Sequence, residues 1–192
     1  MNATKTSHRE IPFNYTSADD RQALTHLLGD GMWEKLESLR ARRVTGRSAR
    51  LLMRVFGEVL VHRRNAYLYE ELVAAGQRRR RLFKHLETDL AVVESHAGAD
   101  ALVVEVIAAT RALLDDLKRE LAGMPAARAR TLAALAPIVG KENVLFDPFA
   151  LVSHATDATD WRLHLPFAVV MPTEEAQVAP LLAAIEELEL KA

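Results

Sequence analysis

The 192 residues are long enough for one domain and part of a second, and 49% apolar with 27% charged residues is typical of a globular protein. The net charge of −1 provides no overall attraction to nucleic acid or membrane, and the lack of cysteine excludes disulfides, zinc–thiolate sites and iron–sulfur ligation within these residues. We recognise no signal peptide and no apolar run of membrane-spanning length, so we expect a cytoplasmic protein without a transmembrane segment.

Helical periodicity dominates the first 140 residues, after a polar arm over 1–16. Ser17 and Asn65 are candidate helix N-caps, and glycine-containing breaks separate the helices near 30 and 46. Four short helices are expected, over 17–28, 32–43, 47–62 and 67–75.

Two longer helices are expected next, over 77–96 and 99–122, each with one apolar stripe. Gly98 leaves too short a loop for a parallel return, so the two helices should form an antiparallel hairpin. Pro125 is suited to the first turn of a further helix over 125–139, which Gly140 would end.

The helical pattern is lost over 141–165, and a strand over 167–170 and a helix opened by Thr173 follow. Pro180 should kink or restart that helix. We therefore predict a mainly α protein: a flexible arm over 1–16, a helical domain over 17–140, a connector over 141–165 and one βα unit over 166–192. Without a neighbour to pair with, the strand should be unstable in this chain alone.

Positive charge is concentrated between Arg40 and Lys84, where thirteen Lys or Arg face three acids. A solvated helical face explains this best, because no nucleic-acid motif accompanies it, and we expect no nucleic-acid partner. Within this region Arg43, Arg47 and Arg50 flank a predicted helix start and are candidates for binding an anion or docking a partner. The alternative is that they pair with acids of the same domain.

Polar residues crowd the stretch between His154 and His164, which also holds Asp157 and Asp160. Histidine and carboxylate can ligate zinc or iron. The spacing matches no helix-borne metal motif, and Asp and Thr often satisfy their own backbone in turns, so we expect turns and no metal site.

Two parts of the chain resemble one protein group. REIPFNYTS (9–17), the TGRSAR run ending at Arg50 and RNAYL (64–68) resemble an uncharacterised helical domain found in long bacterial flavin and iron–sulfur dehydrogenases, although Ala66 replaces a usual proline. The strand and helix of 166–192 resemble the start of the FAD domain of FAD-linked oxidases and dehydrogenases, the group that oxidises D-lactate, glycolate and 2-hydroxyglutarate.

The resemblance implies a role as the N-terminal accessory or docking portion of an FAD-dependent oxidoreductase. FAD would belong to the parent enzyme and not to this chain alone, because in that family the glycine-rich phosphate loop follows where this sequence ends. The downstream FAD domain, in cis or in trans, would be the partner, and the backbone of Val170, Met171 and Pro172 would lie near the flavin. No catalytic residue is assigned, and whether the chain is itself an enzyme stays open. The alternative is a free-standing helical interaction module, or a truncated gene product, without catalysis.

Overall fold

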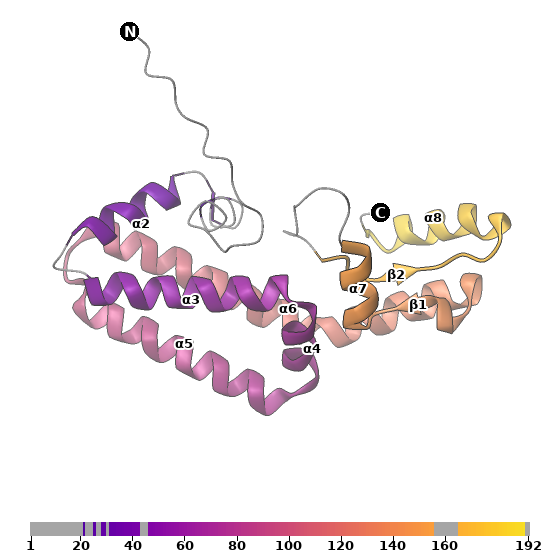
Figure 1. Cartoon of the computed structure of the whole chain (residues 1–192), viewed down its shortest axis with the longest axis horizontal. Helices are drawn as coiled ribbons and strands as arrows, with labels where there is room; N and C mark the ends of the chain where they lie inside the picture. The colour runs from indigo at the N-terminus through magenta and orange to yellow at the C-terminus, as the bar shows by residue number, and fades with distance from the viewer. Residues whose placement is uncertain are drawn as a thin grey trace, which may run out of the picture.

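The computed structural model describes residues 21, 25, 28–29, 31–42, 46–155 and 165–190, and over these the protein is mainly α-helical with one two-stranded antiparallel sheet. The helices are drawn in Figure 1 with their labels. They comprise α2 (Met32–Ala41), α3 (Gly46–Arg64), α4 (Ala66–Ala74), α5 (Gly76–Ala97), α6 (Ala101–Val139), α7 (Pro148–Ala155) and α8 (Val178–Glu187), with 3-10 turns η2 (Lys141–Asn143) and η3 (Glu175–Gln177). None of the helices in this described part is both long and apolar enough to cross a membrane.

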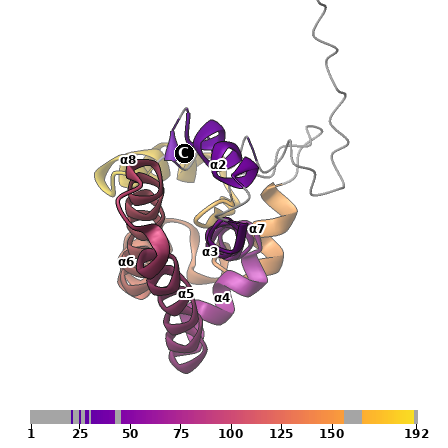
Figure 2. The same ribbon diagram turned by 90° about the vertical axis from the view of Figure 1, so that its left-hand side faces the viewer.

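Helices α2 to α5 and the first half of α6 form a bundle around one apolar core. Figure 2 shows α3 nearly end-on among its neighbours, and α3 contacts α2, α4, α5 and α6. The largest side chains of this core are fully buried: Leu36, Leu39, Leu52, Phe56, Leu72, Leu86, Leu90, Leu114, Leu117 and Leu121. Burial of this kind stabilises a fold by about 1.5–3 kcal/mol per side chain. The predicted stripes on α5 and α6 are thus confirmed as core faces.

The predicted antiparallel hairpin is confirmed as α5 and α6, with Gly98 between them at a positive φ of 57°. Asp100 caps α6 by accepting hydrogen bonds from the backbone N–H groups of Leu102 and Val103. Asn65 caps α4 in the same manner, as predicted.

The expectation of a helix break before Pro125 is wrong. Helix α6 continues for 39 residues, with Pro125 in its interior and exposed to solvent. A proline there removes one backbone hydrogen bond. Buried side chains before and after it, Leu121 and Leu135, hold both halves of the helix against neighbouring elements, which offsets that loss.

The expectation that the late strand has no neighbour is also wrong. The stretch predicted as a connector contains η2, α7 and the strand β1 (Val144–Leu145), which pairs antiparallel with β2 (Val169–Val170). The register pairs Val144 with Val170 and Leu145 with Val169. The observed strand is two residues long, shorter than the predicted 167–170, because only these residues meet β1.

The sheet and α8 pack against the C-terminal half of α6. Leu135 and Val139 of α6, Val144 of β1 and Leu181 of α8 are buried together in a second apolar cluster. Helix α8 begins at Val178, directly after η3, and Pro180 is its third residue. The proline therefore lies in the first turn, as a restarted helix predicts, and does not kink the helix interior.

Candidate docking surface

The predicted arginine group is only partly within the described residues. Arg43 lies outside them, and Arg47 is in the first turn of α3 but its side chain is outside the described part. Arg50 is exposed on α3 and already has an interaction within the protein. Binding of an anion by these three residues therefore stays a prediction.

The polar stretch predicted to form turns also lies mostly outside the described residues, since they stop at Ala155 and resume at Leu165. His154 is the described member. It lies on α7, and its Nδ1 is 2.9 Å from the carbonyl oxygen of Ala150. Within the described ranges no three His, Asp or Glu side chains are grouped as metal ligands.

The predicted flavin-proximal edge, Val170 to Pro172, forms the end of the two-stranded sheet. Val170 pairs with Val144, and the N–H of Met171 donates a hydrogen bond of 2.9 Å to the carbonyl oxygen of Asn143. The side chain of Met171 is 48% exposed. The edge thus presents an apolar side chain, while its Met171 N–H is engaged within the protein.

Helix α7 packs beside this edge, against β2, and its start is well defined by the sequence. The carboxylate of Asp147 accepts a hydrogen bond of 3.0 Å from the N–H of Ala150, and Pro148 fits the first helical position. Ala150 and Leu151 then pack against Ala66 of α4 and Val169 of β2. One face of α7 is therefore fixed, and its other face points away from the protein.

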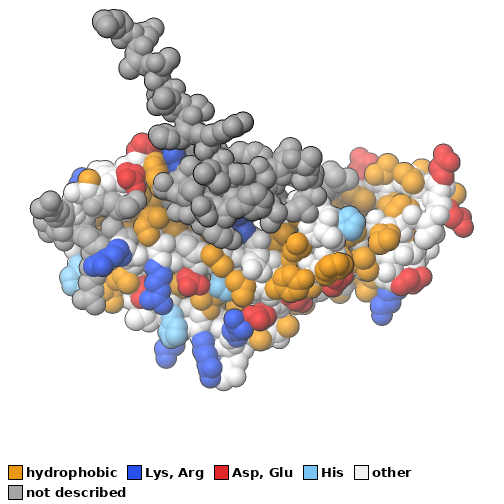
Figure 3. All heavy atoms as spheres, in the orientation of Figure 1, with side chains coloured by type: hydrophobic (Ala, Val, Ile, Leu, Met, Phe, Trp, Pro, Cys, Tyr) orange, Lys and Arg blue, Asp and Glu red, His pale blue; other side chains and the backbone are white. Residues whose placement is uncertain are grey.

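Large apolar side chains are exposed on that outer face, at the end of β2 and on α8, which packs on the opposite face of the sheet. We call this set the C-terminal apolar surface, and its members are Phe149 (72% exposed), Val152, Met171, Val178 and Leu182 (53% exposed). Figure 3 shows hydrophobic side chains over α7 and the strands on the side facing the viewer. Large apolar side chains exposed in this way are candidates for contact with another polypeptide.

Two polar contacts lie beside this region: one connects it to the helical bundle, and the other lies within the bundle. Arg128 of α6 forms an ion pair of 2.8 Å with Glu70 of α4 and lies 5.5 Å from the ring centroid of Phe146. The ring of Phe146 in turn contacts Phe167 edge-on, with centroids 5.7 Å apart. Arg128 therefore connects α4, α6 and the loops that carry the strands.

The second contact holds a tyrosine on α4. The hydroxyl of Tyr69 donates a hydrogen bond of 2.8 Å to Glu120, whose other oxygen lies 3.0 Å from Arg63. Burial, together with the negative charge of Glu120 and this hydrogen bond, raises the pKa of Tyr69 far above its usual value. At neutral pH the phenol therefore keeps its proton and donates this hydrogen bond, and it does not act as an acid or a base.

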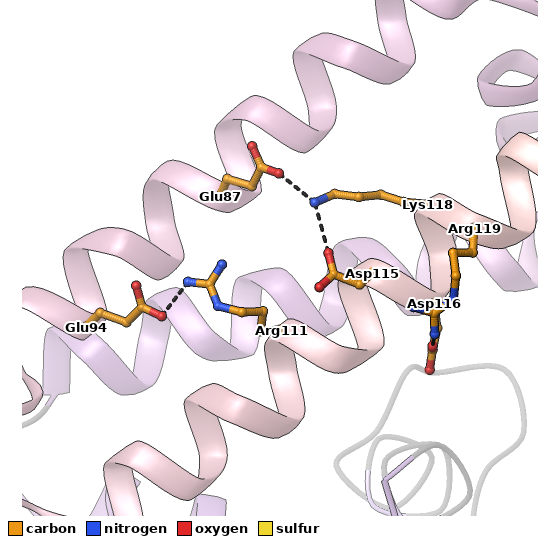
Figure 4. A network of polar contacts seen from close by, with 7 residues as sticks. All are labelled: Glu87, Glu94, Arg111, Asp115, Asp116, Lys118 and Arg119. Atoms are coloured by element: carbon orange, nitrogen blue, oxygen red, sulfur yellow. Dashed lines mark hydrogen bonds and ion pairs between the residues drawn. The ribbon is translucent and has the colours of Figure 1, made fainter.

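Ion pairs also cross the hairpin, as Figure 4 shows. Lys118 of α6 lies 2.5 Å from Glu87 of α5 and 3.1 Å from Asp115, and Arg111 of α6 pairs with Glu94 of α5. Burial lowers the pKa of Lys118, but its bonds to Glu87 and Asp115 outweigh this and raise it. The hydrogen bond to Glu94 raises the pKa of Arg111. All these shifts favour charged, paired states, which is typical of structural contacts.

Sequence reasoning missed α7 and its exposed phenylalanine. The signal was present, because Asp147-Pro148 followed by apolar residues is a helix start. The exposure of Phe149 could not be read from the sequence, since an eight-residue helix has too few turns to show which face is buried.

Comparison with known proteins places most of the chain in one family. A family model described as "Protein of unknown function (DUF3683)" matches residues 6–119, which include α2 to α5 and half of α6. No curated protein and no solved structure matches the chain. The C-terminal apolar surface lies beyond the matched residues.

Proposed function

The chain belongs to the DUF3683 family, and from that premise we propose that it is the N-terminal docking portion of an FAD-dependent oxidoreductase that oxidises a 2-hydroxy acid such as D-lactate. The proposal joins the resemblance of residues 9–17, 45–50 and 64–68 to the helical domain of such enzymes with that of 166–192 to the start of their FAD domain. In this role the helical bundle is the accessory domain, and the cofactor belongs to the downstream domain.

The observation that carries the proposal is the C-terminal apolar surface. Phe149, Met171 and Leu182 are exposed on α7, at the end of β2 and on α8. A two-stranded sheet with strands of two residues is marginal alone and gains stability when further strands or helices join it. A flavin domain continuing from this unit would bury these side chains.

The chain alone should not hold the cofactor. Binding of a dinucleotide pyrophosphate requires several backbone N–H groups in a glycine-rich loop, and no such loop is present in these 192 residues. The N–H of Met171, at the expected flavin edge, is already bonded to Asn143. We expect a titration of the chain with FAD, followed by flavin fluorescence, to give no saturable binding. Micromolar affinity would contradict this expectation.

The function is tested on the protein from its source cells. An antibody raised against 1–140 should recover a polypeptide that carries bound flavin, either in the same chain or in a co-purifying subunit, and that reduces the flavin on addition of a 2-hydroxy acid. Recovery of this polypeptide with no flavin would overturn the proposal.

A variant of the same protein tests the role of the apolar surface. Phe149→Glu should increase the rate at which protease cleaves residues 141–190, because a charge at the interface would loosen the docked flavin domain. Val104→Glu is the matched control, since Val104 is 51% exposed on α6 within the bundle. Equal cleavage rates for the two variants would argue against docking at Phe149.

One observation favours a second candidate, a free-standing helical interaction module. The strand β2 pairs with β1 and the helix α8 packs on α6, so both elements have neighbours within this chain. In that case the same apolar surface would bind a partner without flavin. Recovery of a flavin-free complex by the antibody would support this candidate.

A further inference from the structure

The first half of α5 carries cations that have no ion-pair partner among the described residues. Arg80, Arg81 and Lys84 are exposed, and none forms an ion pair with another described residue. Lys84 lies four positions after Arg80 and three after Arg81, so it is on the same side of the helix as both, where like charges repel each other.

The two arginines before them have roles within the protein. Arg78 forms an ion pair of 2.6 Å with Glu71, and Arg79 donates hydrogen bonds to the carbonyl oxygens of Leu72 and Val73 at the end of α4. Arg78 and Arg79 therefore fix the corner between α4 and α5. Arg80, Arg81 and Lys84 do not contribute to this corner, and their charges stay available.

The end of α8 has the opposite arrangement. Glu186, Glu187 and Glu189 are exposed, and none forms an ion pair with another described residue. They lie at a helix C-terminus, where negative charge opposes the dipole, and no basic residue lies in the last turn of α8. Helix α8 thus carries the charge that destabilises its own end.

These two groups are complementary but cannot meet within one chain. Figures 1 and 2 both show the start of α5 and the helix α8 in separate parts of the molecule. Figure 3 shows acidic side chains at the end occupied by α8 and basic side chains along α5. Contact between the groups therefore requires two molecules.

We propose that the chain associates with a second copy of itself through contact of Arg80, Arg81 and Lys84 of one copy with Glu186, Glu187 and Glu189 of the other. Each copy carries one group of each sign, so a twofold arrangement makes the contact twice. Each contact brings positive charge to the C-terminal end of α8, where it is favourable. The proposal is independent of the flavin function.

The surroundings of the basic group favour this occupant over other anionic partners. No large apolar side chain is exposed on α5, so nothing there would insert into a membrane or stack on bases. Phe83, the aromatic residue of α5, is half-buried, with Lys118 5.7 Å from its ring centroid. The net charge of −1 also opposes a broad association with nucleic acid.

The test is sedimentation equilibrium of the whole chain at low salt. We expect a reversible dimer that dissociates as salt rises, because the contact is ionic and exposed. The variant Arg80→Glu/Arg81→Glu and the variant Glu186→Lys/Glu187→Lys should each weaken dimerisation by about tenfold or more. The four-residue exchange that combines them should restore it, because the signs are again opposite and the net charge is that of the native chain.

Matched controls separate the contact from general charge effects. Arg119→Glu/Arg130→Glu changes the net charge equally at exposed positions on α6 and should weaken dimerisation much less than the α5 variant. The α8 change places favourable charge at a helix end and the α5 change alters exposed side chains, so circular dichroism should show intact folding, and Arg80→Ala/Arg81→Ala provides a milder variant. A wild-type chain that is monomeric at low salt, or an exchange variant that fails to dimerise, would overturn the proposal. Binding of duplex DNA by a monomeric chain would instead assign the basic group to nucleic acid.

Discussion

The hydroxyl of Tyr69 should contribute measurably to stability. It donates to the charged Glu120, and removal of a hydrogen bond to a charged group costs about 1.5–3 kcal/mol when buried. Tyr69 is half-buried, so we expect Tyr69→Phe to lower the free energy of unfolding in urea at pH 7 by about 1–2 kcal/mol. The matched control is Tyr67→Phe, because Tyr67 is 54% exposed and its hydroxyl has no partner among the described residues.

The same tyrosine predicts a pH dependence. Its pKa is raised in the folded protein, so folded Tyr69 keeps its proton at a pH where the unfolded chain loses it. The stabilisation is therefore fully present below about pH 10 and is lost as the pH rises above that value. The stability difference between the native chain and Tyr69→Phe should shrink above pH 10. A constant difference up to higher pH would show that the hydroxyl is not held by Glu120.

At the scale of elements, α6 is shared by the bundle core and by the apolar cluster under α8. Leu114, Leu117 and Leu121 belong to the bundle core, and Leu135 and Val139 to the cluster under α8. The match to the family ends at residue 119, near the middle of this helix. The helix therefore connects the family domain to the unit that follows.

Pro125 should be a weak point in this helix. A proline in a helix interior removes one hydrogen bond and costs about 3 kcal/mol relative to alanine, part of which is recovered through restriction of the unfolded chain. We expect Pro125→Ala to raise the free energy of unfolding by about 1–2 kcal/mol, measured by urea titration. Pro180→Ala, in the first turn of α8 where no backbone bond is lost, should give no gain. Destabilisation by Pro125→Ala would mean that its ring makes a needed contact.

The helices and the strands differ in how far the sequence predicts them. The stripes of Leu86, Leu90 and Val93 repeat over several turns, so the period of α5 and the faces it buries follow from the sequence. The strand β1 has only Val144 and Leu145, too few residues to show alternation, and its partner lies 25 positions later. The exposed face of α7 depends on packing against α4 and β2, which a local pattern does not contain.

At the scale of the whole molecule, the bundle core and the cluster under α8 indicate two cooperative regions, which are joined by α6 and by the small cluster between α4, α7 and β2. The bundle core reaches from Met32 to Leu121, whereas the cluster under α8 lies between Leu135 and Leu181. Small units with few buried side chains open at lower free energy than large cores. We therefore expect the region of β1, β2 and α8 to unfold locally while the bundle stays intact.

A pair of adjacent leucines tests this expectation. Leu181→Ala removes a side chain that is 7% exposed and should cost about 2–3 kcal/mol, whereas Leu182→Ala changes one that is 53% exposed and should be nearly neutral. Hydrogen exchange should show faster exchange in Leu181→Ala over 141–146 and 168–190, with α2 to α5 unchanged. The reason is that the bundle core contains no residue of α8, so loss of the smaller cluster leaves its contacts in place. Equal acceleration across the whole chain in Leu181→Ala would instead show that α6 couples the two clusters into one cooperative unit, and the surface proposed for docking would then be as rigid as the bundle.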